Sequence, residues 1–200
     1  MATNSQPSAA VVKKIQTLAK LAADLHHGQH FNITRLTLIK SLCSDPAAAA
    51  KFAVHIAKLA QRQFKARSGK KKQEYEELIA RAVPAMTRFL KSPTDATESK
   101  LWEFHQRARD AQSKVEHQRW ADVRIIECWE LLIVETAMEC LLYPSHASIL
   151  GYQVARKYAE KYDPHYGTGL IPKSARMMEE IAEFWGRHFL GRGWKKKVGA

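Results

Sequence analysis

A cluster of basic side chains between positions 62 and 72 is the strongest candidate for chemistry in this sequence. Six cations fall within eleven positions, and no acidic residue interrupts them. They are Arg62, Lys65, Arg67, Lys70, Lys71 and Lys72. Such clusters bind nucleic-acid phosphates because each contact releases a condensed counterion. The alternative is a solvated turn, partly neutralised by Glu74, Glu76 and Glu77. We expect this cluster to contact the phosphates of RNA or DNA, or another polyanion.

A second basic cluster lies near the C-terminus, where Gly191 and Gly193 loosen the chain. Its members are Arg187, Arg192, Trp194, Lys195, Lys196 and Lys197. An exposed aromatic ring among cations can stack on a base or lie at a membrane interface. The alternative is that Trp194 folds back onto the core. We expect residues 192–200 to form a short basic tail that contributes to nucleic-acid binding.

The sequence lacks the familiar catalytic and metal-binding motifs. It contains no Gly-x-Ser-x-Gly, Cys-x-x-Cys, His-Glu-x-x-His or Glu-x-x-His. His26 and His30 have the spacing of two ligands on one helical face, but Gly28 between them should end the helix. We therefore expect no metal, no cofactor and no identifiable catalytic residue, and whether the chain is an enzyme stays open.

Two further features contain polar groups that could bind a metal ion or an anion. In both, the sequence pattern favours a structural role. Four carboxylates, Glu127, Glu130, Glu135 and Glu139, are spaced to cover half of one helix. We expect them to face solvent or to pair with Arg, because a buried carboxylate needs a basic partner. The loop at 163–169 places Thr168 between two glycines, which could cradle an anion, but a structured turn is the preferred interpretation.

The three cysteines indicate reduced, buried thiols. Cys128 and Cys140 are twelve residues apart, about 18 Å along a helix, which is too far for a disulfide. Free thiols favour a cytoplasmic location. Residues 1–10 do not have the pattern of a signal peptide. The most apolar stretch, residues 120–143, contains too many charges to span a membrane.

Charge is distributed unevenly along the 200 residues, whose formal net charge is +12. Residues 1–72 have a net charge of +11, residues 73–144 of −4 and residues 145–200 of +5. Such asymmetry favours a polyanionic partner, although a solvated Lys surface has the same composition. Net charge describes association rather than fold.

Helical periodicity dominates the sequence. Apolar residues recur at steps of three and four over 11–25, 33–42, 46–67, 71–90, 96–142, 145–162 and 172–190. Pro84 should kink or split the fourth of these segments. Residues 96–142 form either one long helix or two that meet near 117–120, and the apolar part from Trp120 is expected to be the central helix.

The sequence thus predicts an all-α fold, a single domain over residues 1–200 made of about seven helices around a long central apolar helix. We expect a non-catalytic protein that binds nucleic acid through phosphate contacts, or a subunit of a nucleoprotein assembly. One alternative is an interaction module for an acidic protein partner, using Trp102, Phe104 and Trp120. A helical enzyme or ligand-binding protein is the third alternative.

Overall fold

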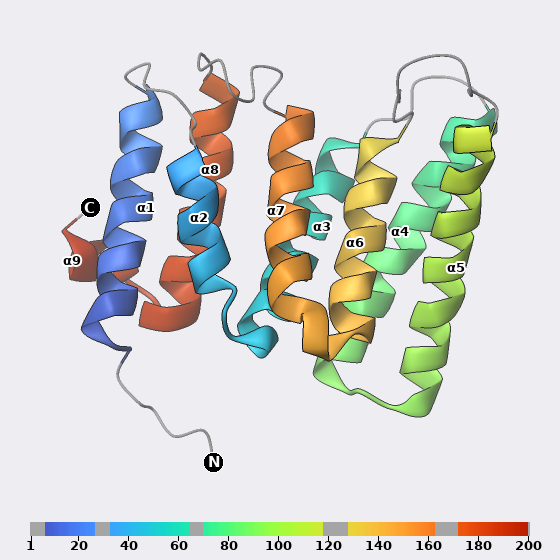
Figure 1. Cartoon of the computed structure of the whole chain (residues 1–200), viewed down its shortest axis with the longest axis horizontal. Coiled ribbons are helices and arrows are strands. Elements are labelled where there is room, and N and C mark those ends of the chain that lie inside the picture. Colours follow the sequence, from blue (N-terminus) through green and yellow to red (C-terminus); the bar gives the residue numbers. More distant parts are fainter. Residues whose placement is uncertain (1–6, 27–32, 65–69, 118–127, 163–171, 200) are drawn as a thin grey trace. The chain divides into compact units, whose positions relative to one another are not determined.

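The protein is all-α in every part of the chain that the structure describes. This computed structural model describes residues 7–26, 33–64, 70–117, 128–162 and 172–199. Within these ranges there are nine α-helices, one short 3₁₀ helix and no strand (Figure 1). The helices are α1 Ala9–His26, α2 Ile33–Leu42, α3 Pro46–Gln63, α4 Lys70–Lys91, α5 Asp95–His117, α6 Trp129–Leu142, α7 Ala147–Tyr162, α8 Pro172–Leu190 and α9 Trp194–Val198, with the 3₁₀ helix η1 at Pro144–His146. The predicted fold class is confirmed.

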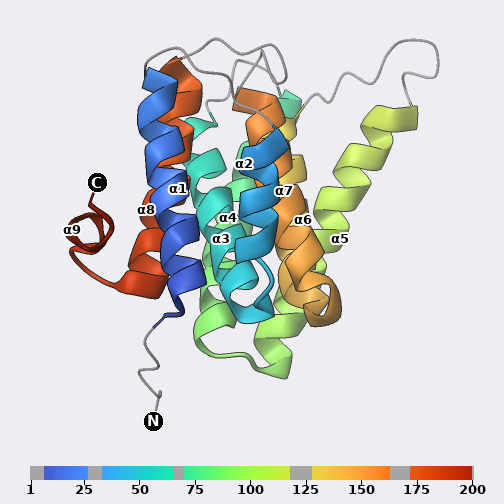
Figure 2. The same cartoon turned by 60° about the vertical axis from the view of Figure 1, so that its left-hand side comes forward.

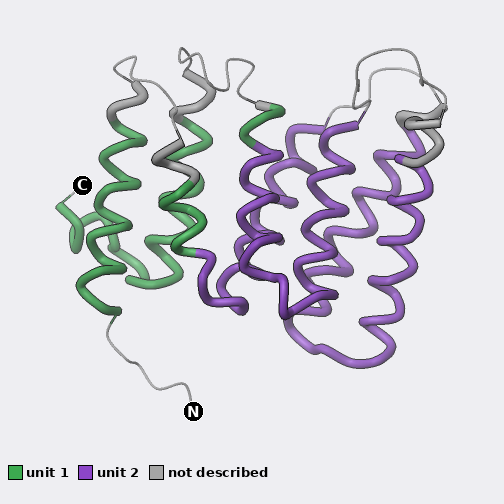
Figure 3. Tube along the Cα trace, viewed as in Figure 1, with its two compact units in different colours: residues 1–42, 159–200 green, residues 43–158 purple. Residues whose placement is uncertain are grey.

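The helices form two compact units, drawn in different colours in Figure 3. Unit 1 consists of residues 1–42 and 159–200, and contains α1, α2, α8 and α9. Unit 2 consists of residues 43–158, and contains α3 to α6, η1 and most of α7. Each unit has its own buried apolar core. The single domain over residues 1–200 stays a prediction.

Unit 1 is built on the packing of α1 against α8, which lie side by side in Figures 1 and 2. Both helices are amphipathic, and each needs a partner to remove its apolar stripe from water. Ile15 and Leu18 of α1 are fully buried, as are Met178 and Trp185 of α8. The short helix α9 packs against α8 and α1.

Unit 2 surrounds α6, which packs most extensively against α3 and also contacts α4 and α5. Leu131, Ile133, Val134 and Met138 of α6 are all fully buried, in agreement with the predicted central apolar helix. The helix is shorter than expected, because it begins at Trp129 and has 14 residues. Residues 118–127 lie outside the described ranges, so the segment 96–142 contains two described helices, α5 and α6.

Two local predictions about α3 and α4 have different outcomes. Asp45 caps α3 as expected, because its Oδ1 accepts from the amide of Ala47 at 3.0 Å and Pro46 follows at the first helical position. Pro84 was predicted to kink or split α4; the split does not occur, because the helix continues through the proline. Val83 and Met86, on either side of the proline, are both buried, and this packing outweighs the one hydrogen bond that proline removes.

Candidate functional site

A groove lined by basic side chains lies between α3 and α4 in unit 2. It encloses a volume of about 630 Å³. Helix α3 lines it with Lys58, Gln61 and Arg62, and helix α4 lines it with Val83, Pro84, Thr87, Arg88 and Lys91. The groove therefore has four cations and no carboxylate on its walls. We refer to it below as the basic groove.

Helical spacing brings these side chains onto facing surfaces. Lys58 and Arg62 are four residues apart on α3, and Thr87 and Lys91 are four apart on α4. Residues at this spacing share one face of an α-helix. Because α3 packs directly against α4, the two basic faces border one groove.

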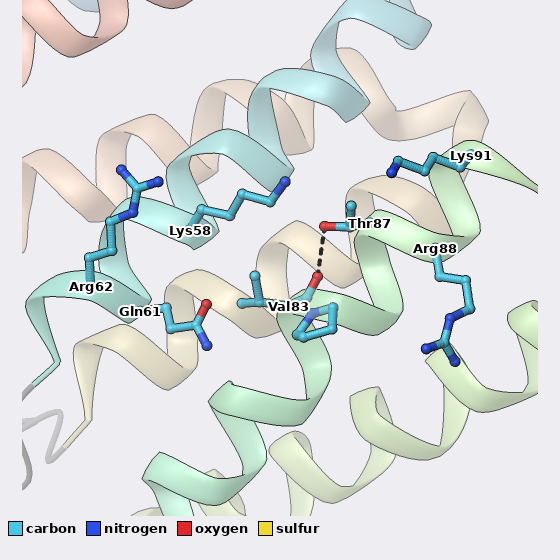
Figure 4. Close-up of a pocket in the computed structure, with 8 residues that line it drawn as sticks. Lys58, Gln61, Arg62, Val83, Thr87, Arg88 and Lys91 are labelled. Carbon is cyan, nitrogen blue, oxygen red and sulfur yellow. Dashed lines mark hydrogen bonds between the residues drawn. The ribbon is translucent and has the colours of Figure 1, made fainter.

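Figure 4 shows how the side chains lie within the groove. The ammonium groups of Lys58 and Lys91 extend toward each other from the two helices, and the guanidinium of Arg88 points to the other side of α4. The hydroxyl of Thr87 donates to the carbonyl oxygen of Val83 at 3.0 Å, so its proton is already used. The donors available to an anion are therefore chiefly the cationic groups and the amide of Gln61.

The four groove cations form no ion pair with any described carboxylate. Other cations of unit 2 do have such partners. Arg81 pairs with Glu77 at 3.1 Å, and Lys100 pairs with Glu103. Arg62, Arg88 and Lys91 are exposed. Like charges that face one groove without counter-charge produce a positive potential that attracts anions.

Only part of the first predicted cluster can be placed. Arg62 lines the basic groove. Lys65 and Arg67 lie outside the described residues, and Lys70, Lys71 and Lys72 form the first turn of α4 with side chains outside the described set. Sequence reasoning missed Lys58, Arg88 and Lys91, because they are neither adjacent nor in one run. The four-residue spacing of Lys58 from Arg62 can be read from the sequence, but the packing of α3 against α4 cannot.

The second predicted cluster is at the end of α8 and in α9, within unit 1. Arg192, Lys195 and Lys196 are exposed. Arg187 pairs with Glu183, one turn earlier on α8. Lys197 donates to the carbonyl oxygen of Leu190 at 2.6 Å. The expected loose tail is instead largely helical, because Trp194–Val198 folds as α9.

Trp194 is packed rather than exposed, which corrects its expected role in base stacking. Only 4% of its surface is accessible, and its Nε1 donates to Glu183 Oε2 at 2.9 Å. A Cβ atom at Gly186 would lie 2.2 Å from the indole ring, so only glycine leaves room for it there. Base stacking requires an open aromatic face. We therefore leave Trp194 out of the proposed interface.

The histidine pair, the 163–171 loop and the expected apolar interaction surface have no site built around them in the described residues. His26 ends α1, while His27, His30 and the loop 163–171 lie outside the described ranges. Phe104, expected on an apolar interaction surface, is only 3% exposed, whereas Trp102 is 36% exposed. Trp120 also lies outside the described ranges.

The cysteines are buried free thiols, as predicted. Burial raises the pKa of Cys140 to about 12, and burial together with the nearby Cys140 raises the pKa of Cys43 still further. Thiols react as thiolates, so these two groups are poor nucleophiles.

Comparisons with protein families, with curated proteins and with solved structures gave no match to this chain. Among the described helices, none has the length and apolar character needed to cross a bilayer. The geometry of the described residues therefore carries the functional argument by itself.

Proposed function

We propose that this protein binds the phosphate backbone of nucleic acid in the basic groove, without catalysis. The observation that carries the proposal is a groove lined by Lys58, Arg62, Arg88 and Lys91 and by no carboxylate, with Lys58 and Lys91 extending toward each other across it. Clustered cations of this kind gain free energy from counterion release when they neutralise phosphates. A role as a subunit of a nucleoprotein assembly, in the cytoplasm, follows as the wider expectation.

Long side chains on two helices suit a phosphate backbone better than a compact small anion. Lys is a flexible point charge, and Arg presents a fork of donors that matches phosphate oxygens. With Lys58 and Lys91 on opposite walls, successive phosphates can be contacted from both helices. We expect little sequence preference, since phosphate contacts position the protein but do not distinguish bases.

Cations beyond the groove are proposed to extend the contact. The sequence after Arg62 contains further cations. Lys65 and Arg67 lie between α3 and α4 in the sequence, and Lys70, Lys71 and Lys72 begin α4. Arg187, Arg192 and Lys195 to Lys197 belong to the other unit and form a separate candidate surface. Each such set adds to affinity only if the same ligand reaches it.

Binding to a fluorescently labelled 20-mer of RNA or DNA, measured by anisotropy at low salt, tests the proposal. The variant Lys58→Ala/Arg62→Ala removes two groove cations and should weaken binding about tenfold or more, since hydrogen bonds to charged groups each contribute about 1.5–3 kcal/mol. The matched control Lys13→Ala/Lys20→Ala removes the same charge from exposed positions of α1 and should change affinity much less.

Two outcomes would contradict the proposal. Equal losses in the groove variant and the control would mean that net charge alone drives binding. An absence of binding by the unmodified chain would leave an acidic protein as the partner, which copurification of a stable complex after nuclease treatment would reveal.

A further inference from the structure

A second cluster of polar groups lies on α5 and α6, apart from the basic groove. His105 on α5 and Glu135 and Glu139 on α6 each offer one ligand atom, and these atoms all lie within 4.8 Å of one another. The residues are far apart in sequence, and the direct packing of α5 against α6 brings them together. The sequence placed both carboxylates on solvent or in ion pairs, and it gave no role to His105.

The cluster is substantially removed from water. His105 is 2% exposed, and the side chain of Glu139 is 30% exposed. The pKa of Glu135 is raised, first by burial and then by the neighbouring Glu139 carboxylate. Its Oε2 is buried and accepts no hydrogen bond from any described residue. Buried polar atoms without partners are rare, and an ion or water is the usual explanation.

We propose that His105, Glu135 and Glu139 bind a divalent transition-metal ion of the Zn²⁺ type. An imidazole with two carboxylates is a donor set that Zn²⁺ accepts, whereas Mg²⁺ and Ca²⁺ prefer oxygen alone. A neutral imidazole and two carboxylates also have the charge that a 2+ ion neutralises. This proposal does not depend on nucleic-acid binding.

The distances fit a metal site that closes by side-chain rotation. Ligands at about 2.0–2.2 Å from a tetrahedral ion lie about 3.3–3.6 Å from one another. His105 Nε2 is already 3.4 Å from Glu139 Oε1. The remaining ligand-atom separations are within 4.8 Å, so a small movement of the Glu135 carboxylate would bring it to ligand spacing. Three protein ligands would leave the fourth position of a tetrahedral ion open for water or another ligand.

Neighbouring groups explain how the cluster is tolerated without an ion. The hydrogen bond with His105 is the main cause that lowers the pKa of Glu139, and the positive charges of Lys157 on α7 and Arg109 on α5 add to it. The same two charges partly oppose the rise in the pKa of Glu135 that burial and Glu139 cause. Lys157 also donates to Thr136 Oγ1 at 2.7 Å, beside Glu135 in the sequence. Trp102 packs edge-on against both His105 and Tyr143, with 5.5 Å between centroids in each pair, and so covers the imidazole from one side.

Isothermal titration of the full chain with Zn²⁺, repeated with Co²⁺ to follow its d–d absorption, tests the site. The unmodified protein should bind one equivalent. Glu135→Gln replaces one ligand oxygen with almost no change in shape and should weaken binding at least about tenfold, the loss that removal of even an outer-sphere partner causes. The control His26→Ala/His30→Ala removes the two histidines that have the i, i+4 spacing of helical metal ligands, and this variant should bind as the unmodified chain does.

The proposal is overturned if the unmodified chain shows no saturable binding, or if Glu135→Gln binds Zn²⁺ as tightly as the unmodified chain does. Loss of binding in the His26/His30 variant alone would place the ion elsewhere and would also overturn it. His105→Gln supplies a second test, with circular dichroism as the check of folding. If it unfolds, Glu135→Gln still decides the outcome.

Discussion

Individual side chains here have roles that depend on what lies within a few ångströms of them. The sequence left two alternatives for Trp194, exposed for stacking or folded back onto the core. Its burial and its hydrogen bond to Glu183 favour the second. Arg62, one of the predicted nucleic-acid-binding residues, lines the basic groove, and its neighbours there, Lys58, Arg88 and Lys91, were missed. A run of charged residues is easy to find in a sequence. A cluster formed by side chains from two different helices can be found only once the packing of those helices is known.

Any larger side chain at Gly186 is predicted to lower the free energy of unfolding as long as Trp194 is present. In Gly186→Ala the new methyl group overlaps the indole, and overpacking of this kind costs about 1–3 kcal/mol. Denaturant unfolding should show this loss. In the Trp194→Ala background the same substitution should cost much less, because the overlapping ring is gone. An equal cost in both backgrounds would contradict the packing described for α8 and α9.

The buried thiols are predicted to resist alkylation in the folded protein. Cys140, with a pKa of about 12, should react with iodoacetamide at pH 8 only after denaturant is added, as followed by mass spectrometry. Its pKa is raised by folding, so its contribution to stability is intact below the unfolded value near pH 9 and is lost as pH rises toward 12. Rapid labelling of Cys140 in native protein would contradict its burial.

Helices were predicted better than any other level of structure, because most of them have a periodic pattern of apolar residues and a Gly, Pro or Asp signal at an end. The stop before Gly28, the Asp45–Pro46 start and the start at Pro172 all agree with described helix ends. The split that was one of two alternatives at Pro84 does not occur, since the buried Val83 and Met86 hold α4 together across it. The helix α9 was also missed, since five residues contain too little periodicity to indicate a helix.

The central position of α6 can be tested by comparing the loss of stability on substitution of two adjacent leucines. Leu131 is fully buried, whereas Leu132 is half-buried. Leu131→Ala should destabilise the protein by about 2–5 kcal/mol through lost burial and a cavity. Leu132→Ala should cost distinctly less. Chemical denaturation compares the two directly, and similar losses would mean that α6 is not packed as described.

The whole chain combines a basic surface in each unit with a metal-binding cluster in one of them. Its net charge of +12 could be read from composition, and the all-α class from periodicity. The basic groove could not, because it depends on α3 and α4 packing side by side. The cluster of His105 with Glu135 and Glu139 likewise depends on contact between residues about 30 positions apart in the sequence.

The salt dependence of affinity tests the groove most directly. For duplex DNA, each neutralised phosphate contributes about −0.9 to the log–log slope, so the four groove cations should supply about −3.6. The variant Lys58→Ala/Arg62→Ala/Arg88→Ala/Lys91→Ala should therefore show a slope shallower by about that amount than the unmodified chain. An unchanged slope in this variant would show that phosphates are neutralised elsewhere, and the basic groove would lose its assigned function.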